Sequence, residues 1–228
     1  MRTAAPAVAT IALMDLVFEQ IRAGGDRNFG YLLGDRRARE AVLIDPSYTP
    51  EAFVARARAQ GLTVTAIVNT HGHPDHVNGN AQAAALTGAP IAAHPLLGPA
   101  LALGDAREMR VGSLHLVCYH VPGHSPDHLV LHETTHHIAF TGDLLFVGKV
   151  GGTGSDEDAR TEWASLRRLM ALLPDAATVW PGHDYGARPS STTALEKRTN
   201  PFLLCPDVEA FLQLKATWAV FKKEYGLT

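Results

Sequence analysis

The chain has 228 residues, of which 46% are apolar and 19% are charged. This length suits one α/β domain with a small appendage, and the balanced composition excludes a disordered, collagen-like or coiled-coil chain. Twenty basic and 23 acidic residues give a net charge of −3, so no strong positive field favours nucleic acid. No apolar run approaches the roughly 20 residues that a membrane span needs.

The cysteine content and the N-terminal segment bear on location. Cys118 and Cys205 are too few for a disulfide framework. Arg2 followed by an apolar stretch resembles a signal peptide, but Pro6 interrupts the stretch and Asp15 follows it closely. We therefore expect a cytoplasmic protein whose first residues are a disordered tip leading into a first strand.

The first part of the chain predicts strands and then helices. The expected elements are strands over 16–21, 30–33 and 41–44, a helix over 50–60, a strand over 64–68, a helix from about 75 to 86, and a strand over 91–93. The run over 64–68 is apolar without interruption, as in a strand buried on both faces.

The second part repeats this order. The expected elements are strands over 114–120, 128–132, 137–140 and 178–180, a helix that opens at Ser155 and stops at Pro174, and a last helix from Asp207 to Gly226. We expect the apolar stripe of the last helix to pack on the domain rather than to bind a partner. The repeated order predicts two stacked sheets with helices outside, and a site made of strand-end loops at one edge.

Four metal-competent side chains follow the buried strand directly: His71, His73, Asp75 and His76. Imidazole and carboxylate are ligands of zinc, iron and manganese. A tight loop aims His71 and His73 at one point, and a helix starting near Asp75 turns the other two towards a neighbouring point. This block therefore predicts a metal site and suits two metals better than one.

Three further candidates follow other predicted strands. His124 lies in Pro-Gly-His-Ser, Asp143 follows a glycine, and His183 follows Pro-Gly. Each alone is ambiguous, but with the first block they make two sets of three ligands that share one bridging carboxylate. Asp45 is a candidate to orient the metal loop, and His128 is interpreted as a strand residue with a supporting contact as its alternative.

In this order the motifs resemble those of the metallo-β-lactamase superfamily over about residues 15 to 185. The resemblance implies an α/β fold, the αββα four-layer sandwich, over 1–190 and a short C-terminal helical extension over 191–228. It implies two divalent metals, with zinc preferred over iron or manganese. Metal 1 would bind His71, His73 and His124, metal 2 would bind Asp75, His76 and His183, and Asp143 would bridge them.

Residues 141–146 and 181–185 look most like the glyoxalase II branch and its relatives, which include persulfide dioxygenases. Two departures from that branch concern glutathione recognition and leave the metal site untouched. The loop before Lys149 lacks the cysteine of a Gly-Cys-Gly-Lys element. The C-terminal helical part is also shorter than the glutathione-binding domain of longer glyoxalase II enzymes.

The resemblance implies hydrolysis of a small-molecule thioester, possible substrates including a glutathione thioester, by a hydroxide shared between two metals. Asp75 and Tyr185 are the candidate catalytic residues, and Lys149, Tyr185 and Arg198 are candidates for binding substrate. A core tyrosine and solvated surface charges are the alternatives for the substrate residues.

Two other functions remain open. In a persulfide dioxygenase, His71, His124 and Asp143 would hold one ferrous iron, and the same ligand list serves both chemistries. Lys149 and the absence of an Arg-Thr-Asp segment favour hydrolysis. A non-catalytic metal-binding protein is the third reading. We expect no nucleic-acid or membrane partner, and a homodimer stays open.

Overall fold

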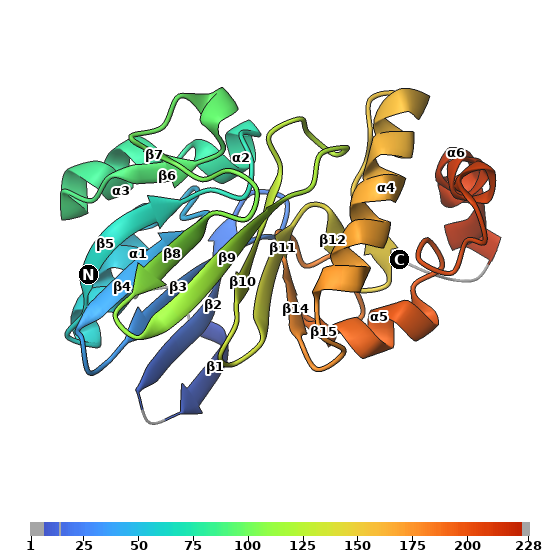
Figure 1. Ribbon diagram of the computed structural model, residues 1–228. Helices are drawn as coiled ribbons and strands as arrows, with labels where there is room; N and C mark the ends of the chain where they lie inside the picture. Colours follow the sequence, from blue (N-terminus) through green and yellow to red (C-terminus); the bar gives the residue numbers. More distant parts are fainter. Residues whose placement is uncertain (1–6, 14, 225–228) are drawn as a thin grey trace.

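The computed structural model describes residues 7–13 and 15–224, which form four layers in the order helices, sheet, sheet, helices (Figure 1). This arrangement confirms the αββα sandwich expected from the sequence. The first sheet contains, in spatial order, β1 (Ala7–Leu13), β2 (Leu16–Gly24), β3 (Asn28–Asp35), β4 (Glu40–Ile44), β5 (Thr63–Val68), β6 (Ile91–Ala93) and β7 (Leu101–Ala102). From β4 to β7 the neighbouring strands are parallel, and from β1 to β4 they are antiparallel.

The second sheet stacks on the first. It contains, in spatial order, β15 (Ser191–Thr192), β14 (Thr178–Pro181), β11 (Ile138–Gly142), β10 (Leu129–Glu133), β9 (Leu114–His120) and β8 (Glu108–Val111). β12 (Leu145–Phe146) and β13 (Lys149–Val150) form a separate hairpin. β15 begins the predicted C-terminal extension and pairs with β14, and a domain boundary after residue 190 stays a prediction.

Successive side chains of a strand point to opposite faces of its sheet, and this alternation explains why the sheets stack. Tyr31 and Leu33 of β3 lie in the core between the sheets, whereas Leu32 faces the helices outside. Aromatic rings fill much of the space between the sheets, with Phe18 4.6 Å from Trp180 between ring centroids. Each fully buried side chain of this size contributes about 1.5–3 kcal/mol to folding, so the two sheets hold the edge loops on a rigid base.

Helices cover both outer faces. α1 (Pro50–Ala59) and α3 (Asn80–Thr87) lie on the first sheet, and α4 (Asp156–Leu172) lies on the second (Figure 1). α6 (Val208–Glu224) packs on α4 through its apolar stripe, where Phe211 and Trp163 have ring centroids 5.3 Å apart. This confirms the expected packing of the last helix, although Gly226 lies outside the described residues. No helix in the described ranges has the length and apolar character to cross a membrane.

Two sequence-based expectations were wrong in detail. Residues 7–13, expected as a disordered tip, form β1, which pairs along β2 because the apolar residues extend the sheet by one hairpin. Residues 1–6 lie outside the described part. The helix expected over about 75–86 is divided into α2 (Pro74–Val77) and α3. Gly79 separates them because it lies against the chain at Pro46, where a Cβ atom would be 2.0 Å from the carbonyl oxygen. The short helix α5 (Thr193–Thr199) was not predicted.

Candidate metal centre

The candidate ligands lie where strands of both sheets end at one edge of the sandwich. His71 and His73 follow β5, His124 follows β9, Asp143 follows β11, and His183 follows β14. β11 and β14 run parallel, so their carboxyl ends meet at the same edge. The short helix α2, which begins at Pro74, brings the last two candidates of the first motif to this edge.

The predicted ligands come together in three overlapping groups of donors. The groups are His71 with His73 and His124, His71 with His76 and Asp143, and Asp75 with His76 and His183. Within each group one donor atom from each residue lies within 4.8 Å of the others. All of the side chains predicted as ligands belong to at least one group, although they come from four separate segments of the chain.

The spacing of the ring nitrogens fits a shared cation. His73 Nδ1 lies 3.1 Å from His71 Nε2 and 3.0 Å from His124 Nε2. On the other side, His76 Nε2 lies 3.3 Å from His183 Nε2. Nitrogens bound to zinc at about 2.0–2.1 Å in a tetrahedron are about 3.3 Å from one another. The observed distances are therefore those expected of nitrogens that surround a small ion.

Asp143 lies between the two sets of nitrogens. Its Oδ2 atom is 3.2 Å from His183 Nε2 and 3.7 Å from His124 Nε2, and its Oδ1 atom is 3.4 Å from His76 Nε2. In the described part of the chain no donor forms a hydrogen bond to the buried Oδ1 atom. An unsatisfied buried carboxylate oxygen is costly, and a divalent cation is a partner that imidazole and carboxylate accept together. The donor set therefore fits a divalent metal.

The electrostatics of the cluster favour a positive charge at its centre. Burial, together with the charge of His76, lowers the pKa of His71 well below its usual value. Burial also opposes charge on His76, but Asp143 and Asp45 outweigh it and raise the pKa of His76 well above its usual value. Burial alone would raise the pKa of Asp143, but the neighbouring His76 and His183 hold it well below the usual range. A metal that binds the Nε2 atom of His76 has to displace the proton that this raised pKa stabilises.

Comparison with protein families identifies the wider group. The model of the metallo-beta-lactamase superfamily matches residues 24–113 and 103–183, which is more than half of the chain. The chain belongs to the metallo-β-lactamase superfamily.

Within the superfamily, the chain is similar to enzymes with two different named activities. It is 37% identical over 179 residues to a hydroxyacylglutathione hydrolase of Polaromonas sp. strain JS666, covering 75% of this chain and 67% of the relative. It is 35% identical over 180 residues to the mitochondrial persulfide dioxygenase ETHE1 of Homo sapiens, covering 77% of this chain and 71% of the relative. The crystal structure of ETHE1 from Myxococcus xanthus superposes with a TM-score of 0.81 at 30% identity, covering 88% of this chain and 90% of that one. These relatives place the chain in the glyoxalase II and ETHE1 branch of the superfamily.

Both residues that the sequence suggested as supports contact residues of the candidate metal centre. Asp45 Oδ2 lies 2.9 Å from His76 Nδ1 and accepts a hydrogen bond of 2.6 Å from the Thr70 hydroxyl. The His128 ring stacks on His71 at 4.9 Å between centroids, and its Nε2 accepts the Asp143 N–H at 3.0 Å. Asp45 thus leaves His76 Nε2 facing the cluster, and His128 fixes the turn that carries Asp143.

The turn between β2 and β3 also supports the site, and the sequence analysis missed it. Asn28 donates a 2.9 Å hydrogen bond from Nδ2 to Asp75 Oδ2. His183 Nδ1 donates to the Asp26 carbonyl at 2.8 Å, which leaves His183 Nε2 free to face Asp143. The only signal in this segment is a Gly-Gly-Asp turn after a strand, and that pattern is typical of many loops.

The candidate substrate residues separate into two places. The ring of Tyr185 stacks on His183 at 4.6 Å, and its hydroxyl donates to Asp26 Oδ2 at 2.6 Å. Lys149 Nζ lies 4.2 Å from the centre of the Tyr185 ring. Arg198 is exposed in the last turn of α5, and in the described residues it makes no hydrogen bond or ion pair to the cluster. The structure therefore brings Tyr185 and Lys149 to the candidate metal centre, but not Arg198.

Proposed function

We propose that the protein is a metal-dependent thioesterase of the glyoxalase II type that uses two divalent ions, preferentially zinc. Metal 1 would bind His71, His73 and His124, metal 2 would bind Asp75, His76 and His183, and Asp143 would lie between them. The observation that carries this proposal is the second donor set, because each of its members has a supporting partner of its own. Asn28 holds Asp75, Asp45 holds His76, and the Asp26 carbonyl holds His183.

When bound, two such metals would acidify a shared water to hydroxide near pH 7 and polarise a thioester carbonyl. The residues of the chain supply the geometry for this reaction. Asp45 and the Asp26 carbonyl fix the tautomers of His76 and His183. Asp75 keeps Oδ2 beside His183 Nε2 at 3.3 Å and is partly exposed, so it is placed to accept the proton that the shared water loses when it becomes hydroxide. A thiolate leaves readily, so the site needs no strong general acid.

Two cations beside the second donor set favour an anionic substrate. Arg27 and Lys149 lie 4.7 Å and 4.2 Å from the centre of the Tyr185 ring, which itself stacks on His183. A carboxylate on the thiol part of a substrate would meet these cations while its acyl carbon lies at the metals. This arrangement supports a small carboxylate-bearing thioester such as a glutathione thioester.

A mononuclear iron persulfide dioxygenase is the second candidate function. It is favoured by the similarity to ETHE1 in sequence and in overall fold. In that case His71, His124 and Asp143 would hold the iron as two histidines and one carboxylate, and the second donor set would not be required. Both free cysteines of the described chain support a cytoplasmic location, which we propose for either activity.

One pair of assays separates the two functions. The zinc-loaded and iron-loaded protein, with His183→Ala prepared in parallel, is given lactoylglutathione while release of glutathione is followed. The same samples are given glutathione persulfide while oxygen uptake and sulfite are followed. We expect hydrolysis by the wild type and its loss in His183→Ala. Oxygen uptake with sulfite formation that persists in His183→Ala would replace the thioesterase proposal with the dioxygenase.

A further inference from the structure

A buried ion pair joins α4 to the C-terminal helix α6 close to the candidate metal centre. Glu162 of α4 has a side chain with 0% exposure, and Lys215 of α6, with 13% exposure, contacts its carboxylate. Burial raises the pKa of Glu162 to about 7, and Lys215 opposes that rise. Apolar side chains of the same volume often stabilise a fold as well as such a pair does. Stability alone therefore does not explain why a charged pair is buried at this position. The other contacts of the two residues suggest a second role.

Lys215 reaches the segment that fixes a candidate metal ligand. Its Nζ atom also donates a 2.8 Å hydrogen bond to the carbonyl of Gly151. The next carbonyl, that of Gly152, accepts a 2.8 Å hydrogen bond from His124 Nδ1. This bond sets the tautomer of His124, so that Nε2 faces His73. Lys215 thus anchors the strand-end segment that orients the imidazole of His124.

Helix α4, which carries Glu162, contacts the loop that leads to the same histidine. The loop that carries His124 lies directly on α4, where the Ser165 hydroxyl donates to the Pro122 carbonyl at 2.6 Å. Gly123 has a φ of +139° and touches the helix so closely that a Cβ atom would lie 2.4 Å from Glu162 Cα. His124 is therefore held between two segments, and the contact between Glu162 and Lys215 connects them.

We propose that Lys215, together with Glu162, is a positioning residue for His124, so that the C-terminal helix sets the affinity of metal 1. The inference rests on the proposed function in that His124 is taken as a metal ligand. The C-terminal extension would then support the metal centre, in addition to covering apolar surface on α4. Removal of the contact between Lys215 and Glu162 should weaken the binding of one metal and leave the binding of the other unchanged.

The test is titration of the metal-free protein with Co²⁺ against a competing chelator, with the visible cobalt absorption recorded at each step. Lys215→Met keeps the length of the side chain and removes its donor. Arg160→Met is the matched control, because Arg160 joins the same two helices through Glu209 at 2.7 Å in an exposed pair (42% and 70% exposure). The double variant Glu162→Gln with Lys215→Met removes both charges and so leaves no unpaired buried ion. Thermal melting of the metal-free proteins compares their folds.

In the wild type we expect two binding steps. In Lys215→Met we expect one step to weaken about 10- to 100-fold with an altered cobalt spectrum, and the other to stay within threefold. The double variant should be weakened in the same step, because no donor reaches the Gly151 carbonyl, and Arg160→Met should match the wild type. Equal behaviour of Lys215→Met and Arg160→Met would overturn the inference, as would wild-type affinity in the double variant. A wild-type chain that takes up no cobalt would instead overturn the proposed metal site itself.

Discussion

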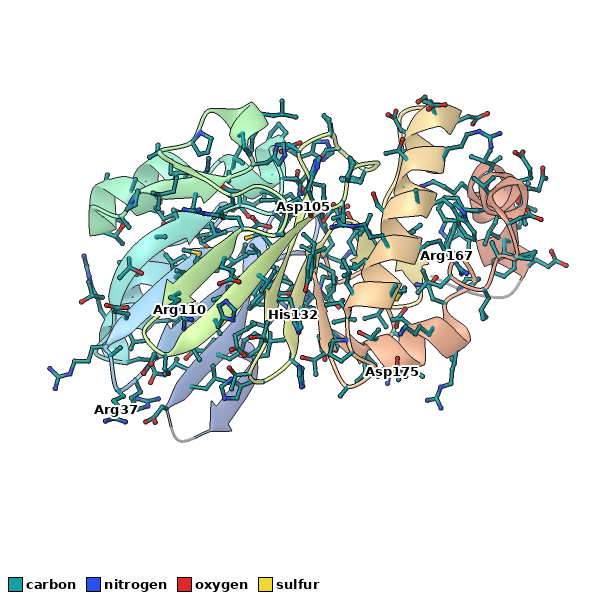
Figure 2. The ribbon with its side chains drawn as sticks, viewed as in Figure 1. Arg37, Asp105, Arg110, His132, Arg167 and Asp175 are labelled. Atoms are coloured by element: carbon teal, nitrogen blue, oxygen red, sulfur yellow. The ribbon has the colours of Figure 1, made fainter. Side chains whose placement is uncertain are left out.

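The two ends of the sandwich each bury an aspartate, and the two carboxylates differ in what surrounds them. Asp35 closes the far end of β3, two residues before Arg37, which is labelled at the lower left of Figure 2. It accepts hydrogen bonds from the N–H groups of Arg37 and Ala38 and from the N–H and hydroxyl of Ser113. Burial opposes the charge, but these donors outweigh it and lower the pKa of Asp35 to about 2.

Asp143, at the metal end, also has a lowered pKa, but the cause is different. Neighbouring histidines stabilise its charge against burial, and its Oδ1 atom has no hydrogen-bond donor in the described chain. A carboxylate saturated by neutral donors ties segments together, here β3 and the turn between β8 and β9, and needs no ion. A carboxylate ringed by imidazoles with an open lone pair suits a cation. The surrounding donors, rather than the pKa, distinguish structure from function.

The largest expected effect is that of Asp143→Asn. Asparagine keeps the shape of the side chain but lacks the charge that would lie between the two proposed metals, so thioester hydrolysis should fall at least about 1000-fold, or about 4 kcal/mol. Metal analysis should find no more than one ion per chain. Hydrolysis is measured as glutathione release, with Asp35→Asn as the control that keeps the wild-type rate. A rate within tenfold of the wild type would show that the carboxylate does not serve the metals.

Asp35→Asn should have the opposite profile. The amide group would face the Ser113 donors, and hydrogen bonds to a charged group are worth about 1.5–3 kcal/mol each, so we expect a loss of about 3 kcal/mol in the free energy of unfolding. Urea unfolding of the chelator-treated protein, followed by tryptophan fluorescence, measures this loss. An unchanged urea midpoint, or a loss of hydrolysis in the folded variant, would contradict the assignment of Asp35 to structure alone.

Asp45→Asn tests whether loss of a residue that supports the candidate ligand His76 has the same effect as loss of a ligand. Asparagine tolerates the left-handed backbone at this position, where φ is 46°, so the fold should survive. Loss of the carboxylate beside His76 Nδ1 should lower metal affinity about 10- to 100-fold. This effect is smaller than that expected for Asp143→Asn, which should bind no more than one ion per chain. Competition with a chromogenic zinc chelator measures the affinity. Wild-type affinity would show that Asp45 only fills space under the loop.

The sequence predicted which histidines and aspartates gather at this end of the sandwich far better than it predicted the residues that support them. The ligand pattern is visible because chemistry restricts the residue types, so His71 or His183 can be recognised beside a glycine at a strand end. Asn28 and Lys215 carry no such mark. Each acts through a contact with a residue far away in the chain, Asp75 in one case and Gly151 in the other. Only the packing of both sheets and α6 brings these partners together.

The same limit applies to the fold. Apolar periodicity predicted the long strands and α4, because burial on a sheet or helix face leaves a repeating pattern. It did not predict the break at Gly79, which depends on the distant Pro46, or the strand β1, whose partner β2 completes its hydrogen bonds. It also gave no reason to separate Asp35 from Asp143, since both lie at the end of a strand and only their donors differ.

The smallest expected effect is a dependence on acid that isolates Asp35. Its pKa is about 2 in the folded chain against an ordinary value of 3.8, so the folded state favours the charged form. The resulting stability, about 2 kcal/mol, is complete above about pH 4 and is lost as the pH falls towards 2. The difference in urea midpoint between wild type and Asp35→Asn, both chelator-treated, should therefore shrink from pH 5 to pH 2. Chelation keeps any release of metal at low pH from contributing to this difference. A difference that stays constant down to pH 2 would mean that the Ser113 bonds need no charge on Asp35, and the contrast between the two ends would then rest on the open Oδ1 atom of Asp143 alone.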